Sequence, residues 1–92
     1  MQGIFVPQNI FKIKGRGLII SGFLKSGVLK TGMVVEINKQ KIPLLGVEAF
    51  NKKVEEVREM DVAAKTLGIV LPETAEKNIE NYINQELIFK GD

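Results

Sequence analysis

The stretch FKIKGRGLIISGFLKSGVLKTG, residues 11–32, carries the strongest structural signals in this chain. Gly15 and Gly17 mark a tight turn, where glycine takes positive φ without a steric penalty. The run Leu18-Ile19-Ile20 then suits a buried strand, and Gly22 interrupts it as a bulge or a close backbone approach would. This pattern predicts a β-hairpin followed by further turns, and therefore a barrel or a sandwich.

Length and composition point to one soluble globular domain covering residues 1–92. Hydrophobic residues make up 45% of the chain and charged residues 26%, which is ordinary for a folded protein. No apolar run approaches the length of a membrane span, and the N-terminus lacks the features of a signal peptide, so a cytoplasmic location without membrane contact is expected. Because cysteine is absent, disulfides and thiolate metal sites are excluded.

The apolar patterning predicts an all-β fold, a small closed barrel of six strands with one short helix before the last strand. The expected strands cover residues 3–13, 18–24, 33–38, 42–50, 61–71 and 86–90. A polar four-residue link, 38–41, joins the third and fourth of them. The segment 51–60 reads as a connection with one helical turn or a short strand. Residues 72–85 begin with proline and acids and predict an amphipathic helix, which covers one end of the barrel or binds a partner.

The net charge of +2 conceals two unlike halves. Residues 1–47 carry seven cations and one acid, whereas residues 48–92 carry six cations and ten acids. Along the first strand, cations alternate with Phe11 and Ile13, which places the cations on one face while the apolar residues face the core. Such a basic face suits phosphate binding, although the solvated side of a half-buried strand looks the same. The predicted RNA-binding residues are Lys12, Lys14, Arg16, Lys25 and Lys30.

The sequence offers no combination of residues that suggests catalysis. Histidine and cysteine are absent, and Ser21 and Ser26 have no base partner in the sequence. The acids at 55, 56 and 59 suit a solvated face, and the spacing of Glu36, Glu48 and Asp61 does not resemble a cation loop. No glycine-rich phosphate cradle occurs, so this chain alone is not expected to bind GTP. We therefore expect a protein that is not an enzyme and has no metal or cofactor.

Three segments together resemble a known family. They are IFKIKGRGLIISGFLKSGVLKTGMVVEI at residues 10–37, GVEAF at 46–50 and EEVREMDVA at 55–63. This order is similar to domain II of the translational GTPases, the β-barrel that follows the nucleotide-binding domain in elongation factor Tu and its relatives. The resemblance runs from about Phe5 to about Phe89. It implies a six-stranded, Greek-key-like barrel that supports a GTPase, touches the small ribosomal subunit and, in tRNA carriers, holds the aminoacylated end of tRNA.

The resemblance also implies a pocket for the end of tRNA. Glu48 matches the family's glutamate that stacks on the terminal adenosine, with a structural turn acid as the alternative reading. Asn51, Asp61 and Lys65 fall at other pocket positions, where the residue types differ from the family pattern. An acid at position 61 repels phosphate, and Lys65 offsets it.

The sequence therefore leads to a non-enzymatic, translation-factor-like module that contacts ribosomal RNA, tRNA or a translational GTPase through a basic face. The alternative is a protein interaction or scaffold barrel without RNA affinity. An exposed apolar patch would favour that alternative, and Phe23 is the residue that would reveal it. The sequence is compatible both with a stand-alone protein and with a piece of a longer factor.

Overall fold

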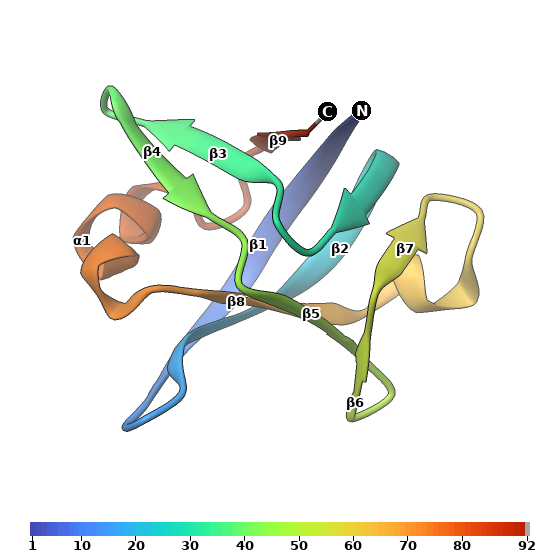
Figure 1. Ribbon diagram of the computed structural model, residues 1–92, viewed down its shortest axis with the longest axis horizontal. Coiled ribbons are helices and arrows are strands. Elements are labelled where there is room, and N and C mark those ends of the chain that lie inside the picture. Colours follow the sequence, from blue (N-terminus) through green and yellow to red (C-terminus); the bar gives the residue numbers. More distant parts are fainter. Residues whose placement is uncertain (92) are drawn as a thin grey trace.

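A computed structural model describes residues 1–91 as one strongly curled antiparallel sheet with short helical turns (Figure 1). Its strands are β1 Gln2–Ile13, β2 Gly17–Lys30, β3 Val34–Ile37, β4 Gln40–Pro43, β5 Gly46–Ala49, β6 Lys52–Val54, β7 Glu56–Arg58, β8 Leu67–Leu71 and β9 Leu87–Lys90. Its helical segments are η1 Val62–Lys65, η2 Glu73–Ala75, α1 Glu76–Ile79 and η3 Glu80–Tyr82. The predicted all-β class is confirmed.

The long β1–β2 hairpin organises the sheet. Its pairing runs from Gly3 opposite Gly27 to Ile13 opposite Gly17, and the connecting turn projects away from the rest of the molecule (Figure 1). β9 pairs with the first half of β1, β8 with the first half of β2, and β7 with the last residues of β2. Three other strands therefore form hydrogen bonds with the two strands of this hairpin.

The register of this hairpin shifts between Pro7 and Asn9, where β1 contains one residue more than β2. Odd-numbered residues such as Phe5 face the core before the shift. After it, Ile10 and Lys12 lie opposite the buried Ile20 and Leu18 and share their face. Gly22 sits at this shift, opposite Pro7, as expected for a bulge or close approach.

The strands pair in the open order β4-β3-β9-β1-β2-β8-β5-β6, and β7 pairs with β2. The pairing within residues 1–91 therefore does not show the closed barrel of six strands that the sequence predicted. The expected strand 42–50 is divided because Leu44 N–H donates to Met33 O and Leu45 N–H to Val70 O, both at 2.8 Å, which carries the chain from one part of the sheet to another.

Three other boundaries differ from the sequence prediction. The link between β3 and β4 has two residues rather than four, because Asn38 and Lys39 both take positive φ and Ile37 pairs with Gln40. For the segment 51–60 the sequence allowed either one helical turn or a short strand. The structure has two short strands there, β6 and β7. The expected strand 61–71 begins only at Leu67, because Val62–Lys65 forms a 3-10 turn first.

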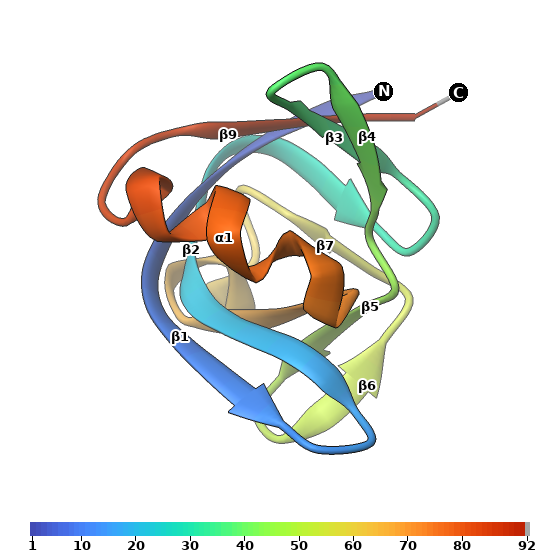
Figure 2. The same cartoon turned by 90° about the vertical axis from the view of Figure 1, so that its left-hand side faces the viewer.

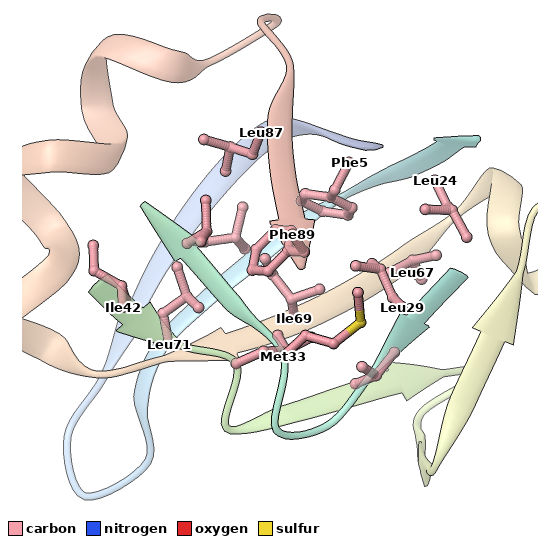
Figure 3. Packing of buried hydrophobic residues seen from close by; sticks show 14 of the residues in the cluster. Phe5, Leu24, Leu29, Met33, Ile42, Leu67, Ile69, Leu71, Leu87 and Phe89 are labelled. Atoms are coloured by element: carbon pink, nitrogen blue, oxygen red, sulfur yellow. The ribbon is translucent and has the colours of Figure 1, made fainter. Parts of the chain in front are cut away.

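The interior is a single apolar cluster drawn from nearly every element (Figure 3). Phe5 of β1 and Phe89 of β9 are fully buried and meet edge to face, with ring centroids 6.5 Å apart. Among the side chains whose placement the structure describes, none that is polar or charged is buried. Phe23 is half-buried, so it does not form the exposed patch considered above.

The helical stretch after Pro72 lies across one open end of the curled sheet (Figure 2). Instead of one continuous helix, the structure has a single α-helical turn between two 3-10 turns. Its buried residues Ala75 and Ile79 join the core cluster. None of the helices in residues 1–91 has the length and apolar character that crossing a membrane requires.

We expect Gly22→Ala to lower the free energy of unfolding by about 1–3 kcal/mol, because overpacking of that size is costly. An ideal Cβ at Gly22 would lie 2.1 Å from the Val6 carbonyl oxygen and 2.8 Å from the Phe5 ring. Urea unfolding followed by circular dichroism measures the change. The matched control is Gly68→Ala on the neighbouring strand, where the nearest atom is 3.9 Å away. Equal midpoints for the two variants would contradict this account of Gly22.

Candidate nucleic-acid interface

Three predicted cations lie at the projecting end of the β1–β2 hairpin, and we call Lys12, Lys14 and Arg16 the basic tip (Figure 1). Gly15 and Gly17 take φ values of 85° and 102°, and Arg16 N–H donates to Ile13 O at 3.0 Å, which closes the turn. All three cations are exposed.

The sequence prediction that Phe11 and Ile13 face the core, with the cations on the opposite face of β1, is wrong. Because of the extra residue between Pro7 and Asn9, Lys12 lies on the core-bearing face, while Phe11 and Ile13 point outward. Phe11 is 53% exposed and Ile13 40% exposed. The end of the hairpin therefore presents apolar side chains on its outer face beside the basic tip.

Three of the seven cations in the first half of the chain pair with carboxylates from the second half. Lys12 Nζ lies 3.3 Å from Glu76 Oε2, Arg16 pairs with Glu48, and Lys25 pairs with Glu86. The cationic side chains are more than half exposed, so each pair contributes little to stability. Within residues 1–91, Lys14 and Lys30 have no acid within 4 Å.

The five predicted cations do not form one patch. β2 has 14 residues, and Arg16 precedes it while Lys30 ends it, so the two lie at opposite ends of the strand. Lys25 lies in its second half, where it reaches Glu86 just before β9. Only the basic tip brings several of them together.

A shallow hollow of about 340 Å³ lies near this tip on the outer face of the sheet, and we call it the Glu48 hollow. Glu48 lies opposite Gly68 of β8, which in turn lies opposite Ser21 of β2. The lining residues are Ser21, Glu48, Phe50, Asn51, Thr66, Leu67 and Gly68. Arg16 reaches the Glu48 carboxylate, so the ion pair joins the basic tip to the hollow.

Two of the four predicted pocket residues line the hollow and two do not. Glu48 and Asn51 are present, whereas Asp61 and Lys65 are not among its lining residues. Asp61 instead accepts a hydrogen bond from Arg58 N–H at 2.9 Å, and Lys65 ends the 3-10 turn η1. That turn precedes β8, and the residues that line the hollow at this point are Thr66 and Leu67.

The sequence analysis did not identify Phe50 as a site residue, although Phe50 is the last residue of the motif GVEAF. It forms the two-residue turn between β5 and β6 with Asn51, and both residues have positive φ, 53° and 64°. Such a turn favours Asn and Gly, so a bulky aromatic residue is strained there. Phe50 is also 71% exposed, so the core gains little from its ring. An unfavourable, exposed aromatic residue at the rim suggests a role in binding rather than in stability.

The hollow suits binding through stacking and hydrogen bonds. Phe50 offers an aromatic face, Ser21 and Thr66 offer hydroxyl groups, and Glu48 offers carboxylate oxygens. A planar polar group with a nearby phosphate matches this set, since the basic tip stands beside it.

Comparison with solved structures identifies the fold. The chain superposes on translation elongation factor SelB from Methanococcus maripaludis with a TM-score of 0.73 at 18% sequence identity, covering 100% of this chain and 19% of that one. A bacterial selenocysteine-specific elongation factor, EF-Sec, gives a TM-score of 0.71 at 19% identity, covering 96% of this chain and 14% of that one. No protein-family description matches the sequence.

These similarities confirm, at the level of the fold, the resemblance to the domain II barrel of translational GTPases. The chain spans less than a fifth of the length of either factor. The activities of those whole proteins are therefore not assigned to it by the match.

The Arg16–Glu48 pair should contribute less than about 1 kcal/mol to stability, because both side chains are partly exposed to solvent. A double-mutant cycle with Arg16→Ala and Glu48→Gln, followed by urea unfolding at low and high salt, measures the coupling. The coupling should fall as salt increases. A salt-independent coupling of several kcal/mol would show instead that the pair is a structural requirement.

Phe50→Asn should raise the free energy of unfolding by about 0.5–1 kcal/mol, because asparagine accepts positive φ more readily than phenylalanine. Thermal unfolding of the variant and the parent protein measures the difference. Phe50→Ala is the matched control, because it removes the ring but keeps a Cβ that disfavours positive φ. A loss of stability in Phe50→Asn would mean that the ring packs usefully, which would argue against a binding role.

Proposed function

We propose that this chain is a non-catalytic, translation-factor-like module of the cytoplasm that binds ribosomal RNA or tRNA through the basic tip and the Glu48 hollow. The fold supports this proposal, because elongation factors contain the same architecture. Fold alone does not define a ligand, so the assignment to RNA depends on the site.

The observation that carries the proposal is the position of the basic tip. Lys14 stands on a projecting turn without an acidic partner among residues 1–91, and Lys12 and Arg16 flank it. Their carboxylate partners are themselves partly exposed, so a phosphate can replace them at little cost. Phosphate contacts of this kind supply sequence-independent affinity.

The apolar and aromatic groups around the tip add a second component. Phe11 is exposed on the outer face of the hairpin, and Phe50 is exposed at the rim of the Glu48 hollow. Unstacked bases of single-stranded RNA bind to such aromatic faces. A single-stranded end or loop therefore fits this surface better than a regular duplex.

A specific observation favours the alternative, a protein interaction module. Met60, on the loop between β7 and η1, is 88% exposed, and Val62, the first residue of η1, is 77% exposed. The loop is ordered by hydrogen bonds, from Glu59 N–H to Gly27 O at 3.0 Å and from Arg58 N–H to Asp61 Oδ2 at 2.9 Å. A rigid loop with exposed apolar side chains suits docking to a protein such as a translational GTPase.

We expect labelled tRNA or a ribosomal RNA fragment to bind this protein with an affinity that falls steeply as salt is raised. Fluorescence anisotropy across a salt series gives the slope of log K against log salt. Lys12→Glu/Lys14→Glu should reduce that slope by about 1–2 units, since each phosphate contact contributes about 0.7–0.9.

The control variant is Lys41→Glu/Lys90→Glu, which changes the net charge equally but lies on β4 and β9, away from the basic tip. It should keep most of the affinity. Absence of RNA binding at low salt, or an equal loss in both variants, would contradict the proposal. If Met60→Ser/Val62→Ser abolishes binding to a GTPase partner while RNA binding is absent, the alternative function is the correct one.

A further inference from the structure

A second hollow of the surface lies between β3 and β9. Both strands have four residues, but they pair only through Val34 with Lys90 and Val35 with Phe89. Beyond these pairs the strands separate, and a groove of about 600 Å³ opens between them. We call it the edge groove; its main lining residues are Val34, Lys41, Tyr82, Leu87, Ile88 and Lys90.

The floor of the edge groove is apolar and accessible. Ile88 is 44% exposed, and Val34 and Tyr82 are half-buried. The register places Val34 opposite Lys90, and Lys41 opposite Glu36, so these side chains share the outer face of the sheet. This is an apolar strip with cations on both sides.

The charges around the strip are not balanced within the described part of the chain. Lys41 and Lys90 have no acid within 4 Å among residues 1–91. Glu86 also lines the groove, but its carboxylate is held by Lys25. Glu36 is the remaining carboxylate, so free cations outnumber free acids here.

We propose that the edge groove binds an extended peptide segment of a protein partner, in which an apolar side chain is flanked by acidic residues. The apolar side chain occupies the space over Val34 and Ile88, and the carboxylates meet Lys41 and Lys90. The separated strands leave room for the peptide backbone to lie alongside β3 or β9, as in strand addition. Nucleic acid fits less well, because the floor of the groove is mainly aliphatic, whereas the bases of a single strand stack on aromatic side chains.

This site is independent of the proposed RNA interface. Figure 2 shows β3, β4 and β9 at the end of the molecule opposite the β1–β2 turn that carries the basic tip. Peptide binding and RNA binding can therefore succeed or fail separately.

The test is selection from a random 12-residue peptide display library against the whole protein, with counter-selection against Lys41→Glu/Lys90→Glu. Enriched peptides should combine a Leu, Ile or Phe with neighbouring Asp or Glu. Their synthetic versions should bind the double variant about tenfold more weakly, the effect of two exposed charge pairs. Ile88→Ser should also weaken binding, whereas Lys12→Glu/Lys14→Glu should leave it unchanged.

Amide chemical shifts measured by NMR locate the bound peptide and show that each variant is folded. Changes confined to residues 34–36, 41, 82 and 86–90, which line the groove or adjoin its lining, would support the proposal. It is overturned if no peptide is enriched over the counter-selected variant, if the enriched peptides are basic, or if the shifts map to another surface. Retention of full affinity by both Lys41→Glu/Lys90→Glu and Ile88→Ser would also overturn it.

Discussion

The register of the β1–β2 hairpin is the constraint on which the rest of the structure depends. Three other strands pair with its two strands, so their positions follow from how β1 lies against β2. The extra residue between Pro7 and Asn9 reverses which side chains face the core, and the chain crosses that point only because Gly22 has no Cβ to meet Val6 O. The same shift exposes Phe11 and turns Lys12 toward Glu76, so it also shapes the candidate interface.

Electrostatics in this molecule acts over short distances. The sequence separates a basic first half from an acidic second half, but folding brings the two together in ion pairs that span 32 residues from Arg16 to Glu48 and 61 residues from Lys25 to Glu86. Pairing of this kind weakens any broad positive field. The proposed RNA ligand would therefore depend on particular contacts at the basic tip and the Glu48 hollow rather than on long-range attraction.

The curled sheet separates two surfaces of different chemistry. One end carries cations, hydroxyl groups and exposed aromatic rings beside the turn of the hairpin, which suits RNA. The other end carries an aliphatic strip between Lys41 and Lys90, which suits an acidic peptide. The core between them consists only of apolar side chains in the described residues, so neither surface depends on a buried polar network. A small module with two such ends can connect an RNA with a protein.

The sequence by itself determined the all-β class, the glycine turn at Gly15 and Gly17, and the helical start after Pro72, because each depends on local backbone preferences and on alternating polarity. It also named Glu48 and Asn51 together, and both residues line the same hollow. Only the tertiary structure decided the division of residues 42–50, the presence of Thr66 and Leu67 rather than Asp61 and Lys65 in the lining of the hollow, and the orientation of Lys12. These features depend on register, on a 3-10 turn that precedes β8 and on partners distant in sequence, and local patterning does not contain that information.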